Sequence, residues 1–491
     1  MSRSLTAFLR PARRPSGRIQ CYSPGPIVRR SIQQSTPGRA AQLNEHRPGE
    51  PDVPVRKSPS GRDFPLDTGF ISRITIPQLE GDAPDGVSAA PGSLRVLVQG
   101  KDGEKISKGV DYAMLRDACS CERCVDPHSK QRSFRTSDIP AYITPRSVKR
   151  NGDQLEIQWR DDIPGYDESH TSTYPEEFLR SPASYSLGSA TAGRRRTFWD
   201  REYMQRAQHW ISYEDYVNDD ARFATAMRKL AKLGLIFVKD IPDSREMVER
   251  IATRMGPLRN SFYGLTWDVR TVPQAKNVAY TNQFLGFHMD LMYMKDPPGF
   301  QLLHCLKNSC DGGESLFADA FGAAARLYTK DTRAAQLLRE FPLNYEYIHK
   351  DQMYHNSWPV IETESPERIS PSHFRHINYS PPFQGPFRRP KGITTNEWGK
   401  KFRHFREALA AFTKELENEQ AIFQLKLNPG ECVIFENRRV VHARRAFNTT
   451  SGERWLAGAY VDEDAVLSRF RVCKATQPDA WHYKETPADG E

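Results

Sequence analysis

The sequence contains no uninterrupted apolar run of the roughly 20 residues that a membrane-spanning helix requires, so we expect no membrane span. It also has few cysteines, eight in 491 residues, and they are not spaced like the paired framework of a small secreted protein. Three of them, Cys119, Cys121 and Cys124, crowd within six positions. This cysteine usage favours a reducing environment and one metal cluster.

Acidic residues are absent from residues 1–44, which hold eight arginines and no lysine. The chain has a net charge of +9, and without those eight arginines 62 basic residues face 61 acidic ones, so we do not expect nucleic-acid binding. An Arg-rich, Ser-rich, acid-free start is typical of a mitochondrial transit peptide, with a cytoplasmic location as the alternative. A basic arm that binds an anionic partner is a second interpretation. The arginines are dispersed among Leu, Phe and Ile, which favours targeting.

Two stretches poor in apolar residues divide the chain. One is rich in Pro, Arg, Asp and Ser, and the other is rich in small residues, so we expect both to be linkers. The predicted order is a transit-like segment at 1–44, a disordered linker at 45–68, a small domain at 69–180, a linker at 181–197, a larger domain at 198–475 and a tail at 476–491.

Short apolar or alternating segments predict strands in both domains. The small domain has them at 93–100 and 154–162, and the larger domain has them at 234–242, 277–282, 300–307, 314–321, 431–437 and 455–463. Residues 212–234 predict a helix that Gly234 ends. The expected fold class is therefore mainly β with α: a jelly-roll domain decorated with helices, preceded by a small β domain.

Cys119, Cys121 and Cys124 bring three thiolates onto one tight loop, and a closed tetrahedral zinc site needs a fourth ligand. We predict His170 as that ligand. His128 is only four residues past Cys124, where the chain must still turn around the ion. Three unliganded surface thiols are the alternative, and their dense spacing argues against it. The small domain is thus predicted to bind structural Zn(II).

His288 and Asp290 lie two residues apart, and on an extended strand both side chains leave the same face. His442 follows an apolar run that would form a strand and bring it to the same mouth of the predicted barrel from the opposite side. Two imidazoles and one carboxylate that leave positions open are the ligand set of non-haem Fe(II) oxygenases. Arg454 opens the next predicted strand, where its guanidinium could bind the distal carboxylate of 2-oxoglutarate. Each residue alone has an ordinary structural explanation, but the four in this order favour an iron and 2-oxoglutarate site.

A more specific signal is the resemblance of long stretches to a known family. The chain strongly resembles the γ-butyrobetaine dioxygenase family, of the taurine-dioxygenase-like superfamily, in FYGLTWDVRTVPQAKNVAYTNQFLGFHMDLMYMKDPPGFQLLHCLKNSCDGGESLFADAF and NPGECVIFENRRVVHARRAFNTTSGERWLAGAYVDEDAVLSRFRV. LRDACSCERC followed by His170 looks like that family's small zinc domain. The resemblance implies a double-stranded β-helix, Fe(II) at His288, Asp290 and His442, and 2-oxoglutarate at Arg454. It also implies O2 as co-substrate, ascorbate as a reductant, and a homodimer.

The same resemblance implies how a substrate is held. A trimethylammonium group donates no hydrogen bond, so proteins recognise it with aromatic faces. The family's cage positions match Tyr263, Trp267, Tyr280 and Tyr460, and Asn277 matches a position near the substrate carboxylate. Without the resemblance, these would be ordinary core and loop residues.

The segment HINYSPPFQGPF departs from the family pattern. Asn378 is retained, but Pro381 and Pro382 follow where the family is rich in asparagine, and proline has no amide donor. The predicted reaction is hydroxylation of γ-butyrobetaine to L-carnitine, with release of succinate and CO2. Trimethyllysine, or another amine or sulfonate, is the alternative substrate. A catalytically silent metal-binding scaffold is the alternative of a different class, and the retained triad and Arg454 argue against it.

Overall fold

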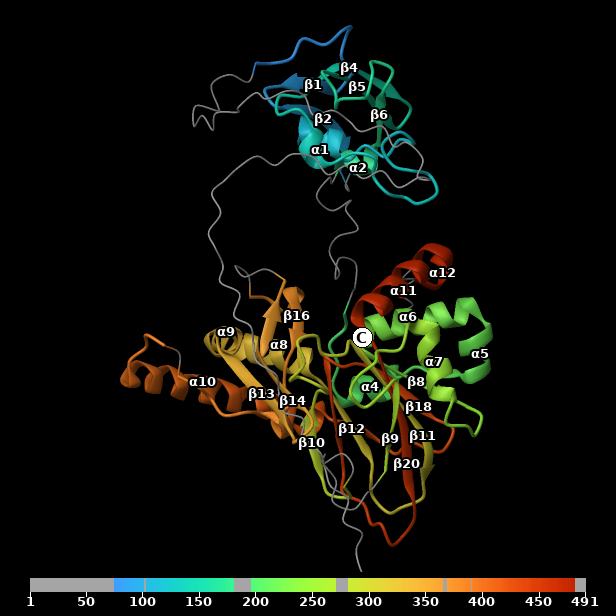
Figure 1. The fold of residues 1–491 in the computed structure, drawn as a ribbon, viewed down its shortest axis with the longest axis vertical. Helices are drawn as coiled ribbons and strands as arrows, with labels where there is room; N and C mark the ends of the chain where they lie inside the picture. The colour runs from blue at the N-terminus through green and yellow to red at the C-terminus, as the bar shows by residue number, and fades with distance from the viewer. Residues whose placement is uncertain are drawn as a thin grey trace, which may run out of the picture. The chain divides into compact units, whose positions relative to one another are not determined.

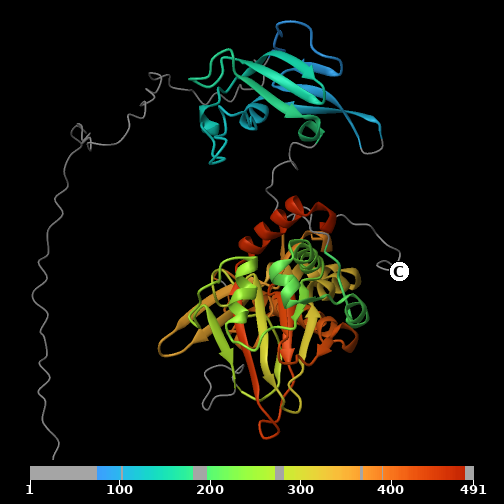
Figure 2. The ribbon, with the colours of Figure 1, turned by 90° about the vertical axis from the view of Figure 1, so that its right-hand side faces the viewer.

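The computed structural model describes residues 75–100, 103–180, 196–270, 281–364, 369–389 and 391–481. The transit-like segment and two of the predicted substrate-binding residues, Asn277 and Tyr280, lie outside these ranges. Figure 1 and Figure 2 show two folded parts, which are described separately below. No helix in the described part of the chain is long and apolar enough to cross a membrane.

The amino-terminal part contains two three-stranded antiparallel sheets. The predicted strands at 93–100 and 154–162 are confirmed as the central strands of the two sheets. Alternate residues of the first, Leu94, Val96 and Val98, are buried in one apolar cluster, as a half-buried strand requires. The elements are β1 (Val87–Ala90), β2 (Ser93–Gln99), β3 (Lys105–Asp111), α1 (Tyr112–Asp117), η1 (Thr136–Asp138), β4 (Thr144–Asn151), β5 (Gln154–Arg160), β6 (Thr171–Pro175) and α2 (Glu176–Arg180).

The carboxy-terminal part is built on two sheets, which form the predicted double-stranded β-helix. The four-stranded sheet has the order β10-β19-β12-β17, and the six-stranded sheet has the order β7-β8-β18-β11-β20-β9. All pairs are antiparallel except β7 with β8. The strands are β7 (Trp210–Ser212), β8 (Leu235–Lys239), β9 (Thr266–Val269), β10 (Leu285–His288), β11 (Phe300–Asn308), β12 (Ser315–Asp319), β17 (Phe423–Leu425), β18 (Cys432–Glu436), β19 (Val440–Arg444) and β20 (Arg454–Val461).

Helices cover the outer face of the six-stranded sheet. Phe300 and Leu302 of β11 pack among helix residues in one apolar cluster, whereas the alternate residues Gln301 and Leu303 point the other way, into a cavity. The helices of this part before β9 and after β20 are α4 (Arg201–Ala207), α5 (Tyr213–Asn218), α6 (Asp220–Leu233), α7 (Met247–Met255), α11 (Glu463–Thr476) and α12 (Pro478–Trp481).

The prediction of one continuous helix over 212–234 is wrong. It is two helices, α5 and α6, because Asp219 accepts hydrogen bonds from the backbone N–H groups of Ala221 and Arg222 and starts a new helix. Its predicted end is confirmed, since Gly234 caps α6 with a φ of 72°.

A long insertion between β12 and β17 adds helices and two small hairpins. Its side chains join the apolar cluster that contains residues of β10, β12 and β19. The elements are α8 (Ala320–Lys330), α9 (Thr332–Glu340), β13 (Pro342–Ile348), β14 (Met353–Pro359), β15 (Ile361–Thr363), η3 (Pro371–His373), β16 (Phe374–Ile377), η4 (Pro381–Phe383), α10 (Thr395–Leu416) and η5 (Glu419–Ala421). The insertion therefore packs against the sheet that carries the site described next.

Candidate active site and zinc site

Two neighbouring strands of the four-stranded sheet carry the candidate histidine ligands. His288 is the last residue of β10 and His442 is the middle residue of β19. The two residues are direct partners in the antiparallel register, and their ring centroids are 4.1 Å apart. The expectation that His442 reaches the mouth from the opposite side is wrong, because β19 is paired directly with β10.

Asp290 lies in a turn beyond β10, so the expectation that it shares an extended strand with His288 is also wrong. The next residue, Leu291, has a φ of 58°, in the left-handed region. Asn437 holds this turn, because its Oδ1 accepts the N–H of Asp290 (2.9 Å) and its Nδ2 donates to the Asp290 carbonyl (3.0 Å). The turn returns the carboxylate to the two imidazoles.

The three side chains place one donor atom each within 4.8 Å of one another. Oδ1 of Asp290 lies 3.4 Å from Nε2 of His288 and 4.0 Å from Nε2 of His442. The Tyr460 hydroxyl donates to the other carboxylate oxygen, Oδ2 (2.6 Å), and Nδ1 of His288 lies 2.8 Å from the Gly286 carbonyl. Such partners orient metal ligands, and the set fits one Fe(II) bound on a single side with further positions open.

Burial and charge set the protonation of this group. Burial raises the pKa of Asp290, but hydrogen bonding from His288 and Tyr460 and the nearby imidazoles outweigh it, so the pKa falls below its ordinary value. Burial lowers the pKa of His442 to about 3. The site therefore presents a carboxylate and a neutral imidazole, the forms that bind a metal.

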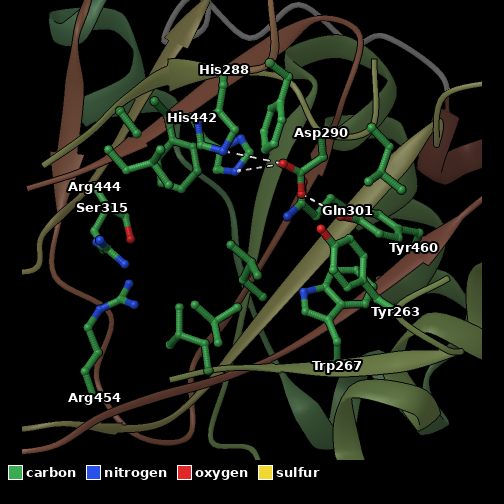
Figure 3. Close-up of a pocket in the computed structure, with 18 of the residues that line it drawn as sticks. Tyr263, Trp267, His288, Asp290, Gln301, Ser315, His442, Arg444, Arg454 and Tyr460 are labelled. Atoms are coloured by element: carbon green, nitrogen blue, oxygen red, sulfur yellow. Dashed lines mark hydrogen bonds and ion pairs between the residues drawn. The ribbon is translucent and has the colours of Figure 1, made fainter. Parts of the chain in front are cut away.

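The cavity beside the triad lies between the two sheets (Figure 3). Arg454, predicted for 2-oxoglutarate, lies at one end and faces Arg444, which we did not predict. Burial and the charge of Arg454 lower the pKa of Arg444 to about 10. Ser315 is the register partner of Arg444 and lines the same end. The buried guanidinium of Arg444, the half-buried one of Arg454 and the Ser315 hydroxyl form a receptor for a carboxylate.

Arg444 could have been found from the sequence. It follows His442 by two residues on one strand, so the two side chains leave the same face. We missed it because the second arginine of a run such as HARR is usually a surface residue.

The other end of the cavity is aromatic. Tyr263, Trp267 and Tyr460, three of the predicted cage residues, line it (Figure 3). The Trp267 ring lies against Tyr460, with centroids 4.0 Å apart and planes at 29°. Trp267 is the register partner of Gly458, where any side chain would meet the indole at 2.4 Å. Phe383 also lines this end, from the segment HINYSPPFQGPF.

Asn378, which the family pattern retains, is engaged elsewhere. Its Oδ1 accepts from Nε and Nη2 of Arg438 (3.1 and 2.6 Å). Its Nδ2 donates to the Pro359 carbonyl (2.7 Å) and to Glu362 (2.9 Å). The amide is fully buried and is not among the residues that line the cavity, so its hydrogen bonds stabilise the insertion.

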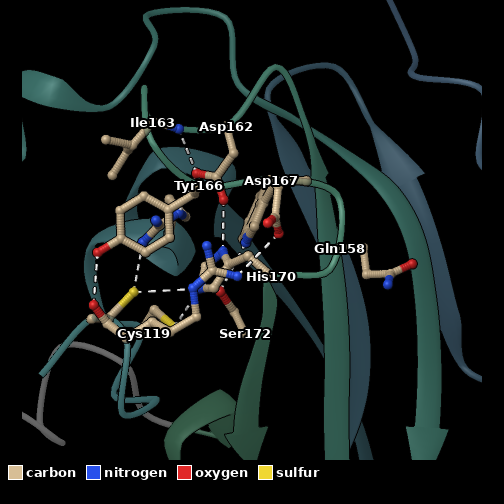
Figure 4. A network of polar contacts seen from close by, with 12 residues as sticks. Cys119, Gln158, Asp162, Ile163, Tyr166, Asp167, His170 and Ser172 are labelled. Atoms are coloured by element: carbon tan, nitrogen blue, oxygen red, sulfur yellow. Dashed lines mark hydrogen bonds and ion pairs between the residues drawn. The ribbon is translucent and has the colours of Figure 1, made fainter.

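The predicted cysteine cluster is assembled in the amino-terminal part (Figure 4). Nε2 of His170 lies 3.3–3.6 Å from the sulfurs of Cys119, Cys121 and Cys124. Nδ1 of His170 donates to Asp162 (2.6 Å), which fixes the ring with Nε2 toward the thiols. The alternative ligand, His128, is not part of the group of four potential ligands.

Arg116 is a second partner of this cluster. It is fully buried, donates to Asp162 through Nε (2.5 Å) and to the Cys124 sulfur through Nη1 (3.3 Å), and lies over the rings of Phe134 and Tyr166. The hydrogen bond between the Cys119 thiol and the Cys124 sulfur lowers the pKa of Cys124 and raises the pKa of Cys119. Three sulfurs and one imidazole nitrogen fit a tetrahedral zinc ion.

The iron-binding set, the arginine pair and the two-sheet fold define an Fe(II)- and 2-oxoglutarate-dependent dioxygenase, and comparisons with known proteins agree. The family described as "Taurine catabolism dioxygenase TauD, TfdA family" matches residues 200–460. The family "Gamma-butyrobetaine hydroxylase-like, N-terminal" matches residues 92–180. The chain belongs to the TauD/TfdA family and is an enzyme of its γ-butyrobetaine and trimethyllysine dioxygenase group.

Three relatives illustrate this membership. Dioxygenase str8 of Strobilurus tenacellus is 32% identical over 428 residues, which cover 83% of this chain and 96% of that protein. The γ-butyrobetaine dioxygenase of Pseudomonas sp. (strain AK-1) is 30% identical over 73% of this chain and 88% of its own length. The human mitochondrial trimethyllysine dioxygenase is 28% identical over 74% of this chain and 82% of its own length.

Proposed function

We propose that the enzyme hydroxylates a small trimethylammonium amino acid, with γ-butyrobetaine as the first candidate, to give L-carnitine, succinate and CO2. The observation that carries this proposal is the aromatic end of the cavity, formed by Tyr263, Trp267 and Tyr460 beside the metal-binding set. Among the described residues that line the cavity, the basic ones are Arg444 and Arg454, both at the opposite end. A cation therefore meets aromatic faces away from the two guanidinium groups.

Each set of residues has a separate role in the proposed reaction. His288, Asp290 and His442 would bind Fe(II), and Arg454 with Arg444 and Ser315 would bind the distal carboxylate of 2-oxoglutarate. Bound iron with 2-oxoglutarate would activate O2, of which one oxygen atom enters the substrate C–OH group and the other enters succinate, while 2-oxoglutarate loses CO2. The chain contributes position, because the aromatic faces anchor the cation and so select the carbon that faces the metal.

Trimethyllysine is the second candidate substrate. Relatives that act on it are 26–28% identical to this chain, close to the 27–30% of the γ-butyrobetaine enzymes. Asn378 is also engaged away from the cavity, which favours a different contact for the substrate carboxylate.

The test is an anaerobically iron-loaded enzyme assayed for succinate with 2-oxoglutarate, O2 and each trimethylated substrate. We expect γ-butyrobetaine to stimulate succinate release and to be converted to L-carnitine. Strong turnover of trimethyllysine alone would assign the second candidate. Failure of both would reject a trimethylammonium substrate, and full activity of His288→Ala would reject the iron assignment.

We further propose that Cys119, Cys121, Cys124 and His170 bind structural Zn(II), that the enzyme is a homodimer, and that residues 1–44 direct it to mitochondria. Metal analysis, light scattering of the purified protein and sequencing of the mature amino terminus test these three proposals in turn. Ascorbate would serve as a reductant that keeps iron in the Fe(II) state, which a comparison of turnover with and without it measures.

A further inference from the structure

Phe383 is an aromatic residue of the cavity that has no role above. Trp267 and Tyr460 reach the aromatic end from β9 and β20, which are neighbours in the six-stranded sheet, and Tyr263 reaches it from the segment just before β9. Phe383 instead belongs to η4 of the insertion, where it is half-buried and lines the same cavity. Two parts of the chain that are far apart in the sequence therefore supply the aromatic residues of this cavity.

Tyr293 connects Phe383 to the aromatic end rather than to the arginine end. The Tyr293 ring meets the Phe383 ring edge to face, with centroids 5.4 Å apart. The Tyr293 hydroxyl shares a side-chain hydrogen bond with Tyr263, which is one of the predicted cage residues. Phe383 is thus one ring away from the residues proposed to bind the cation.

The backbone holds the segment of Phe383 against the metal-binding turn. Met289, which lies between the ligands His288 and Asp290, donates its N–H to the Tyr379 carbonyl (2.9 Å). Phe383 follows Tyr379 by four residues. The segment that carries this ring is therefore joined directly to the residues that would hold the metal.

Two prolines restrict the turn that presents the ring. Pro381 and Pro382 begin η4, and each fixes its own φ. Just after the turn, Gly385 donates its N–H to the carbonyl of Asn344 on β13 (2.8 Å). The position of the Phe383 ring is therefore set before a substrate enters, so little conformational entropy is lost on binding.

The Phe383 ring is not stacked on another ring in the described part of the chain. Its ring contacts there are with Tyr293, at an interplanar angle of 69°, and with Tyr347, at 6.5 Å and 45°. The Trp267 and Tyr460 rings, in contrast, are stacked on each other. The face of an aromatic ring is the negative side of its quadrupole, so it attracts a cation.

We propose that Phe383 is a further face of the cation site and contacts the trimethylammonium group of the substrate, an inference that rests on the function proposed above. The charge of this group is spread over its methyl groups, so several aromatic faces bind it at once. Phenylalanine has no hydrogen-bonding side-chain atom, so its ring suits a cation or an apolar group and not a carboxylate. Phe383 thereby helps to select a quaternary ammonium over a neutral group of the same shape.

The experiment compares Phe383→Leu with the wild-type holoenzyme, because leucine keeps an apolar side chain and removes the aromatic face. Phe387→Leu is the matched control, since Phe387 lies on the same segment, is also half-buried and packs on Phe402, but does not line the cavity. Succinate formation gives KM for the trimethylated substrate that the wild type accepts. The inhibition constant is measured for the isostere in which a tert-butyl group replaces trimethylammonium.

We expect Phe383→Leu to raise KM for the trimethylated substrate about 3-fold to 30-fold more than it raises the inhibition constant of the isostere, the contribution of one cation–π face. KM for 2-oxoglutarate should stay that of the wild type, because Arg454 lies at the other end of the cavity. Phe387→Leu should change the two substrate constants by the same factor. Both ligands are measured on the same variant, so a general loss of folded enzyme does not alter their ratio.

An unchanged KM in Phe383→Leu would overturn the inference. Equal losses for the substrate and its isostere would overturn it as well, because the ring would then be only an apolar wall. The same selective loss in Phe387→Leu would count against the assignment to Phe383. A wild type that accepts neither trimethylated substrate would instead reject the proposed function itself.

Discussion

Replacement of Arg116 tests whether the cysteine cluster is a zinc site that depends on its buried charge. Three thiolates and Asp162 carry four negative charges, and Zn(II) with Arg116 supplies three positive ones. Arg116→Met would remove the charged donor from the Asp162 oxygen, which would keep only the Ile163 N–H, and would remove the Arg116 N–H from the Cys124 sulfur. Arg116 is fully buried, so water does not replace it.

Loss of such an outer partner lowers metal affinity about 10-fold to 100-fold. This corresponds to about 1.4–2.7 kcal/mol of binding free energy. The assay is a competition between the reduced, full-length protein and a chromophoric zinc chelator, followed by metal analysis. Arg116→Lys keeps the positive charge but loses the planar guanidinium group and its several N–H donors, so we expect a zinc affinity between those of the wild type and Arg116→Met.

Arg123→Gln is the matched control. Arg123 also contacts Tyr166 and bonds to Asp167, but its side chain is 42% exposed, so its ion pair contributes little. Zinc affinity of Arg116→Met equal to that of Arg123→Gln would refute the reasoning. A wild type that binds no zinc at all would refute the site itself.

Three further predictions concern the carboxy-terminal part. Arg454→Gln should raise KM for 2-oxoglutarate about 10-fold or more, since it removes a charged hydrogen-bonding partner, and an unchanged KM would count against the arginine pair. Gly458→Ala should push Trp267 aside, because a Cβ would meet the indole at 2.4 Å, and so raise KM for the trimethylated substrate more than for 2-oxoglutarate. Burial raises the pKa of Glu362, but His376, Arg438 and Asn378 outweigh it and lower the pKa from 4.5 to about 2. That shift contributes about 3 kcal/mol of stability above pH 4.5, which is lost as the pH falls toward 2. Glu362→Gln should therefore be less stable than the wild type in urea at pH 6 and nearly equal to it near pH 2; a difference independent of pH would contradict this.

Local patterns predicted the strands well where apolar residues alternate or run together, as in β2, β5, β11 and β18. They failed where a single polar side chain redirects the chain. Asp219 divides the helix expected over 212–234, and Asn437 holds the turn after His288. The spacing of apolar residues does not predict this turn. Asn437 acts on a backbone group 147 residues away, which the sequence does not place beside it. Asp219 instead acts on the next residues of its own segment, as a helix N-cap does, and this local signal was overlooked.

The sequence by itself determined the chemistry of this protein. Histidine and aspartate at positions 288, 290 and 442 are residue types that bind Fe(II), and the arginine at position 454 is a residue type that binds the carboxylate of 2-oxoglutarate. Only the tertiary structure decided which side chains face the cavity. Strand pairing placed Arg444 beside Ser315 and Gln301 beside Tyr460, and it left Asn378 buried elsewhere. Register is a property of two strands together, so one strand's sequence does not contain it.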